Sequence, residues 1–336
     1  MALYCGIDLH STNHLVTVID EVDRRLYEKR LPNQLAATLQ ALAPYREQLV
    51  GIAVESTFNW YWLVDGLMEA GYEVRLVNTA AVKQYEGLKY ADDRHDAYWL
   101  AHLMRLGVLP TGYIYPKAGR ALRDLMRRRL GLVRVASRQL IGVQSEIWRQ
   151  TGLRVSSNRL RRAEFAMEFA DVNVARAVQC ALSVYRALRA EIEGLEQTIL
   201  SQVKLEPAFE VLRTITGVGP ILALTIMLET GEVRRFAGVG NFASYARCVK
   251  SERLSNGKKK GEGNAKSGNK YLSWAFSEAA HFAVRYCPQA KRFYERKRAH
   301  RNGIVAIRAC AHKLARAAYY MMRDQTAFDA QRLFAH

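Results

Sequence analysis

The chain has 336 residues, of which 49% are hydrophobic, and this length predicts two or three domains rather than one small core. Its 50 Lys and Arg residues against 32 Asp and Glu residues give a net charge of +18, which predicts a polyanionic partner, either nucleic acid or an anionic membrane surface. A membrane span and a secreted disulfide scaffold are excluded, because no apolar run reaches about 18 residues, no signal sequence opens the chain, and the five cysteines are scattered. A cytoplasmic protein is therefore expected, and nucleic acid rather than a membrane is expected as its partner.

The first 80 residues predict an α/β domain. Their apolar runs have the length and alternation of strands, and the stretches between them carry apolar residues at helical spacing. The order of elements, three strands and then helix, strand, helix, strand and helix, is that of a ribonuclease-H-like fold. Strands are expected at residues 3–9, 14–20, 26–31, 49–55 and 73–77, and helices at 57–70 and at 34–49, where Pro44 should introduce a break.

Four acidic residues fall where folds of this kind place metal ligands. Asp8 lies in the first strand, Glu55 ends the fourth, and Asp93 and Asp96 begin a helix with a spacing that puts both on one face. A carboxylate in an apolar strand is costly unless it is paired or bound to metal, and a cluster of carboxylates suits Mg²⁺ together with the oxygens of a phosphate substrate. The alternative, that each acid only marks a strand end or a helix N-terminus, is weaker for four acids at matching places than for any one of them.

Three further residues near these acids are secondary candidates. Asp92 is an alternative to Asp93, because a spacing of four from Asp96 also gives one helical face. His10 and Asp20 are weaker candidates, and both are expected at the surface.

Residues 117–162 form the most basic segment, which predicts one or two long helices with a positive stripe. Only Asp124 and Glu146 oppose its arginines, whose planar donors suit contacts to phosphate. The alternative is a solvated helix face, but such faces usually mix charges of both signs. The basic residues are Lys117, Arg120, Arg123, Arg127, Arg128, Arg129, Arg134, Arg138, Arg149, Arg154, Arg159, Arg161 and Arg162.

The segment that follows has a heptad pattern. Val178, Tyr185, Ile192 and Ile199 fall seven residues apart, which predicts a coiled-coil hairpin or a dimer arm. The alternative is an ordinary helix packed within one subunit.

A polar, glycine-rich loop is expected at residues 250–270 in a final helical domain. A loop of this length is usually functional or disordered. Its serines, Ser251, Ser255 and Ser267, lie among cations and flexible backbone, where a phosphate could dock, although loop serines are mostly structural.

Together these segments resemble the DEDD transposases of the insertion-sequence-110 family, and the resemblance covers nearly the whole chain. In the N-terminal part it rests on the Gly-Ile-Asp step at Asp8, the strand ending at Glu55, and the motif that runs from Asp93 to Asp96. In the C-terminal part it rests on residues 212–220 and on the Ser-Gly-Asn-Lys-Tyr-Leu run at 267–272.

The resemblance implies a site and a chemistry. The N-terminal domain would be RuvC-like and would bind Mg²⁺ through Asp8, Glu55, Asp93 and Asp96, with Asp93 selected over Asp92. Ser255 would attack a phosphate of double-stranded donor and target DNA and form a covalent phosphoserine intermediate. Because this serine is followed by Asn and then Gly, rather than directly by Gly, Ser251 stays open as an alternative.

The resemblance also implies partners and a division of the chain. The enzyme would be guided by a bridge RNA encoded by its own element and would act as a homo-oligomer, a dimer or a tetramer. Two other hypotheses stay open, a metal-dependent RuvC-like nuclease without a covalent intermediate and a nucleic-acid-binding protein without catalysis. The expected domains are a RuvC-like domain at 1–115, a basic helical and coiled-coil region at 116–205, and a mainly helical transposase domain at 206–336.

Overall fold

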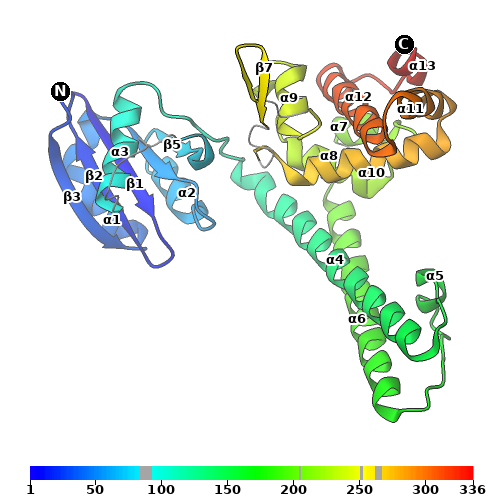
Figure 1. Ribbon diagram of the computed structural model, residues 1–336. Coiled ribbons are helices and arrows are strands. Elements are labelled where there is room, and N and C mark those ends of the chain that lie inside the picture. The colour runs from blue at the N-terminus through cyan, green and yellow to red at the C-terminus, as the bar shows by residue number, and fades with distance from the viewer. Residues whose placement is uncertain (83–92, 204–205, 250–252, 262–266, 336) are drawn as a thin grey trace. The chain divides into compact units, whose positions relative to one another are not determined.

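The computed structural model describes residues 1–82, 93–203, 206–249, 253–261 and 267–335. The chain divides into two units, Met1–Lys117 and Ala118–His336, and each is described here by itself. The first unit contains a β-sheet with helices packed on it, and the second unit is mainly helical (Figure 1). This confirms the expected combination of an α/β N-terminal part and a helical C-terminal part.

The first unit is built on a five-stranded sheet with the order β3-β2-β1-β4-β5. The pairs β1–β2 and β2–β3 are antiparallel, whereas β1–β4 and β4–β5 are parallel. All five strands expected from the apolar runs are present. They are β1 (Leu3–Leu9), β2 (Asn13–Ile19), β3 (Arg25–Pro32), β4 (Leu49–Glu55) and β5 (Val74–Val77).

Helices cover both faces of this sheet. On one face α1 (Leu35–Leu42) and α2 (Tyr61–Glu69) enclose the main core of the unit, and α1 gives way to a 3₁₀ turn at Ala43–Gln48, as expected from Pro44. On the other face lies α3 (Asp93–Arg105), which packs directly on β1 (Figure 1). Gly6 permits this close approach, because a Cβ atom there would lie 1.9 Å from the carbonyl oxygen of Ala97.

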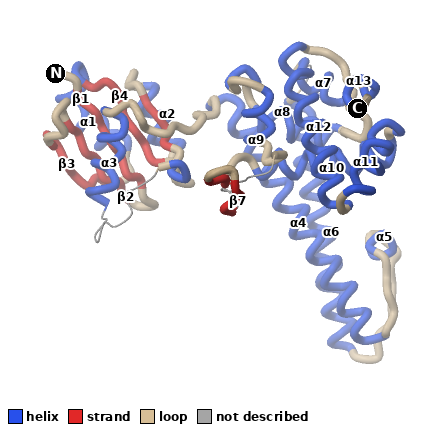
Figure 2. The backbone as a smooth tube through the Cα atoms, turned by 45° about the horizontal axis from the view of Figure 1, so that its top comes forward, coloured by secondary structure: helices blue, strands red, loops and turns tan. Residues whose placement is uncertain are grey.

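A helical hairpin begins the second unit (Figure 2). It consists of α4 (Lys117–Thr151) and α6 (Val172–Gln202), joined through the short α5 (Ser157–Leu160). The heptad residues Val178, Tyr185 and Ile192 of α6 pack against α4 of the same chain. The apolar heptad face is therefore used within one subunit.

The positive stripe expected on α4 is interrupted by structural arginines. Arg127 forms an ion pair with Glu229 at 2.6 Å, and Arg129 pairs with Glu196 at 2.5 Å. Arg120 and Arg123 are buried. Besides Asp124 and Glu146 within the segment, Glu196 and Glu229 from other helices therefore neutralise part of this stripe.

A helical cluster with one small β-hairpin completes the second unit. Its core is rich in alanine, which allows the helices to pack closely. No helix among the described residues combines the length and the apolar character needed to cross a bilayer. The elements are α7 (Pro207–Arg213), α8 (Pro220–Thr230), α9 (Val239–Tyr245), β6 (Arg253–Ser255), β7 (Lys258–Gly261), α10 (Lys270–Tyr286), α11 (Pro288–His300), α12 (Gly303–Asp324) and α13 (Ala330–Phe334).

Candidate active site

The acids of the first and fourth strands lie on neighbouring strands and on one face of the sheet. Ile7 of β1 is paired with Val54 of β4, so Asp8 and Glu55 are each one residue further along parallel strands. Ile7 and Val54 pack in the core beneath α1 and α2. Because successive residues of a strand point to opposite faces, Asp8 and Glu55 point to the face that α3 covers.

The first turn of α3 brings a third acid to this place. Asp8, Glu55 and Asp96 line one cavity of about 290 Å³. Burial, a hydrogen bond shared with Asp8, and the nearby charges of Asp8 and Asp96 raise the pKa of Glu55 to about 8. The same acids would accept a cation readily, since a positive charge removes this repulsion. The other lining residues are Thr79, Val82, Trp99 and Leu100.

Asp93 lies in a second group, which also contains Asp8. Nε2 of His10 is 3.1 Å from Oδ2 of Asp8 and 3.3 Å from Oδ2 of Asp93. One ligand atom from each of these three residues lies within 4.8 Å of the other two. Arg30 of β3 also forms an ion pair with Asp93. Its hydrogen bond, aided by the charge of His10, holds the pKa of Asp93 below its usual range.

These two groups together fit a divalent cation. Asp8 belongs to both, and its side chain is almost fully buried. Although Oδ2 of Asp8 lies close to His10, neither this oxygen nor Nε2 of His10 makes a well-aligned hydrogen bond to any described residue. A buried polar atom left in this state costs about 1–3 kcal/mol, which a bound ion would offset. Carboxylate oxygens are the ligands that hard divalent cations prefer, and imidazole is acceptable to softer ones.

The secondary candidates have different places. Asp92 lies outside the described residues. His10, expected at the surface, has a side chain that is 38% exposed, and its ring lies between two of the acids. Its position two residues after Asp8 was the signal that it lies on the same face as that acid. Asp20, also expected at the surface, is 1% exposed and accepts backbone hydrogen bonds from Val22 and Arg24, so it stabilises the turn after β2. Arg30 was missed because its contact with Asp93 is made between distant parts of the chain.

Ser255 lies in the second unit, at the end of β6. It is paired with Lys258 across a two-residue turn in which Asn256 and Gly257 have φ angles of 50° and 71°. Such angles define the tight turns that join antiparallel strands, and Asn-Gly is their most favourable sequence. The loop expected at residues 250–270 therefore contains a hairpin, and the step that follows Ser255 is its turn. Ser251 lies outside the described residues.

The base of this loop is held by a buried polar network. Asn269 accepts hydrogen bonds from two backbone N–H groups that start α10, and its amide donates to Glu229 at 2.6 Å. Glu229 also accepts two hydrogen bonds from Arg127, at 2.6 and 2.7 Å. Arg247, on the other side of the loop, donates to the carbonyl groups of residues 267 and 268. The chain on either side of the hairpin is thereby anchored to α8, α4 and α9.

Comparisons with known proteins agree for both units. A family model of transposases of the IS110 DEDD type matches residues 5–145, and one described as "Transposase IS116/IS110/IS902 family" matches residues 209–295. A protein of Pseudomonas aeruginosa named "Probable family 20 transposase" is 24% identical over 82% of this chain and 85% of its own length. A mini-circle protein of Streptomyces coelicolor named for IS117 is 23% identical, with 100% of this chain and 97% of the relative covered. The DEDD type of the first model points to a divalent metal.

Proposed function

We propose a chemistry for this chain from the premise that it belongs to the IS110 family of transposases, enzymes that cleave and rejoin DNA. The first unit is taken as a RuvC-like catalytic domain in which Asp8, Glu55, Asp93 and Asp96 hold Mg²⁺. The observation that carries this proposal is the convergence of acids from two strands and a helix N-terminus on one face of the sheet, around a cavity. Metal bound there would supply Lewis-acid stabilisation of charge on the phosphate oxygens.

The protein's own residues would perform the remaining tasks. The Ser255 hydroxyl loses its proton and its Oγ forms a bond to a DNA phosphorus atom, while the bond from that phosphorus to one deoxyribose oxygen breaks and this oxygen takes up a proton. The resulting phosphodiester to serine keeps the energy of the broken bond, so rejoining to a new strand needs no ATP. Lys258 and Lys260, exposed on the same hairpin, add positive charge beside a DNA backbone.

The same proposal includes two kinds of partner. The protein would bind a guide RNA encoded by the element, and it would form a homo-oligomer, either a dimer or a tetramer. The charge of +18 supports a polyanionic partner, and the family resemblance is what makes that partner a bridge RNA as well as DNA. Because the apolar heptad face of α6 is covered by α4, contacts between subunits would use other surfaces. RNA that co-purifies with the protein, together with the mass of the complex by light scattering, would test both partners.

One rival deserves a test, because the acids assemble within the first unit without Ser255. A metal-dependent RuvC-like nuclease would cut DNA with these acids alone. Ser255→Ala separates the two hypotheses, since a hydrolytic enzyme would continue to cut and the proposed recombinase would not. Asp93→Asn should abolish cutting in both cases, and a protein that only binds nucleic acid would show no activity to lose.

A further inference from the structure

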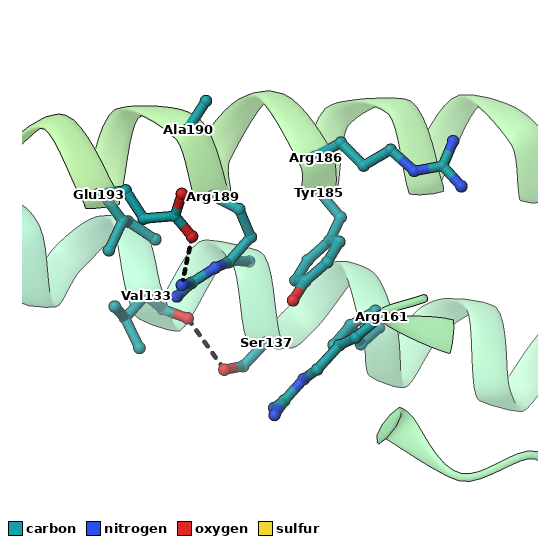
Figure 3. Close-up of a pocket in the computed structure, with 11 residues that line it drawn as sticks. Val133, Ser137, Arg161, Tyr185, Arg186, Arg189, Ala190 and Glu193 are labelled. Atoms are coloured by element: carbon teal, nitrogen blue, oxygen red, sulfur yellow. Dashed lines mark hydrogen bonds and ion pairs between the residues drawn. The ribbon is translucent and has the colours of Figure 1, made fainter. Parts of the chain in front are cut away.

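A groove runs along the helical hairpin, between α4 and α6, and nothing in the proposed chemistry uses it (Figure 3). Its volume of about 530 Å³ falls within the range of roughly 300–1,000 Å³ that is typical of small-ligand sites. Val133 of α4 gives it a partly exposed apolar floor, beneath which Leu140 and Ile192 are buried. Tyr185 and Arg189 extend from α6 into the space between the two helices (Figure 3).

The rim of the groove is positively charged. Arg186 and Arg189 come from α6, and Arg161 comes from the residue that ends α5. Glu193 pairs with Arg189 at 2.8 Å and is the one acid in the lining, so three arginines and one glutamate leave a net charge of +2.

Two of these arginines have guanidinium N–H groups that are not used in hydrogen bonds to described residues. Within the described part of the chain, the Arg186 guanidinium makes one hydrogen bond, to the carbonyl oxygen of Ala163 at 3.2 Å. Arg161 is exposed, and no hydrogen bond or ion pair links its guanidinium to any residue that the structure describes. A guanidinium presents five donors, and those not used by the protein are available to phosphate oxygens.

We propose that this groove binds a nucleotide whose base is unpaired, within a single-stranded segment of nucleic acid. A phosphate alone would need the arginines but would gain nothing from an apolar floor. A duplex would present its phosphates to the arginines but would keep its bases stacked and out of reach. An unpaired nucleotide satisfies both parts of the site, with its base or sugar on the apolar floor and its phosphate at the rim.

This site is independent of the serine chemistry, because its residues are neither the candidate metal ligands nor part of the serine hairpin, which is the β6–β7 hairpin that contains Ser255. Failure of the proposed function would leave the groove as a binding site, and failure of the groove would leave the serine chemistry intact. RNA and DNA share the features on which the argument depends, so the experiment compares them directly.

The test measures binding of the full-length protein to fluorescent oligonucleotides of one sequence, as single-stranded RNA, single-stranded DNA and duplex DNA. Arg161→Ala removes a guanidinium that makes no hydrogen bond or ion pair to the residues that the structure describes. Ala190→Trp places a large apolar side chain at an exposed position of the groove's lining without changing its charge. The matched controls are Arg176→Ala and Ala187→Trp, exposed positions of α6 that do not line the groove.

Both groove variants should weaken binding of one or both single strands by about three- to tenfold and leave duplex binding within about twofold of wild type. Arg161→Ala should also reduce the slope of log affinity against log salt by about one. The controls should behave as wild type. A preference for the RNA or the DNA strand would identify the source of the nucleotide.

Three outcomes would overturn the proposal. Unchanged single-strand affinity in both groove variants would leave the groove without this ligand. Equal losses for single strands and duplex, with no effect of Ala190→Trp, would show contacts to phosphate only. A change in oligomeric mass with unchanged oligonucleotide binding would assign the groove to a second copy of the chain.

Discussion

Replacing Glu55 with Gln should stabilise the metal-free protein at alkaline pH and abolish DNA cleavage. Burial and the neighbouring acids, Asp8 and Asp96, raise the pKa of Glu55 from its ordinary value of 4.5 to about 8. The folded protein therefore keeps a proton that the unfolded chain has released. The cost of Glu55 to stability is absent below about pH 4.5, grows as the pH rises, and is complete above about pH 8.

The size of this effect follows from the pKa difference. Each tenfold change in proton affinity corresponds to about 1.4 kcal/mol, so the free energy of unfolding that Glu55 removes at high pH is at most about 5 kcal/mol. Because Glu55 is only partly buried and shares its proton with Asp8, solvent screening and coupling reduce the expected value to roughly 1–3 kcal/mol. For a domain of about 100 residues, a change of 1 kcal/mol shifts the unfolding midpoint by about 4 °C. Glu55→Gln should therefore raise the midpoint by about 4–12 °C at about pH 8.5.

The assay is thermal unfolding in the presence of a metal chelator, monitored by circular dichroism at about pH 5 and about pH 8.5. The gain in Glu55→Gln should be present at the higher pH and nearly absent at the lower. Added Mg²⁺ should stabilise the wild type more than the variant. A midpoint for Glu55→Gln at or below that of the wild type at both pH values would refute the reasoning.

Asp20, in the turn that follows β2, provides a control with the opposite sign in the same unit. Burial acts to raise the pKa of Asp20, but hydrogen bonds from Arg24 and Val22 outweigh it and hold this pKa below its usual range. Its contribution to stability is present above the ordinary Asp pKa and is lost in acid. Asp20→Asn should therefore lower the unfolding midpoint at about pH 8.5, where Glu55→Gln raises it.

Three further predictions test other parts of the structure. Arg30→Gln should tighten Mn²⁺ binding several-fold in calorimetric titration, because it removes a cation that engages a candidate ligand, and weaker binding would contradict this. Glu229→Gln should destabilise the protein by about 1–3 kcal/mol, because one carboxylate oxygen that accepts from Arg127 or Asn269 is replaced by an N–H donor; an unchanged midpoint in thermal unfolding would contradict this. Gly6→Ala should lower the free energy of unfolding by about 1–3 kcal/mol, because the added methyl group clashes with the backbone of α3. Gly131→Ala, in a helix with open space around it, should instead stabilise by about 0.5–1 kcal/mol, and similar effects of the two glycine substitutions in chemical denaturation would show the reasoning to be wrong.

Local rules were sufficient for much of the first unit. Apolar runs located all five strands, and the fixed geometry of Pro44 located the break after α1. The convergence of Asp8 with Glu55 follows from the same rules, because both acids lie near the carboxyl ends of two strands that are parallel neighbours.

Contacts between distant segments were beyond these rules. Arg127 and Glu229 are separated by 102 residues, and nothing in the pattern of α4 distinguishes this paired, partly buried arginine from its exposed neighbour Arg128. The ion pair of Arg30 with Asp93 is of the same kind. The serine hairpin is a different case, because the Asn-Gly step after Ser255 was a local turn signal that the loop interpretation did not use.

Trapping of a covalent adduct tests the central claim most directly. Purified protein, Mg²⁺, labelled duplex DNA with the ends of the element, and RNA from its flank are incubated, denatured and separated on a gel. The account predicts a protein–DNA adduct in the wild type and in Ser251→Ala, none in Ser255→Ala or Asp93→Asn, and a phosphate on Ser255 in the digested adduct. Cut DNA without an adduct in any variant, or an adduct that persists in Ser255→Ala, would contradict it.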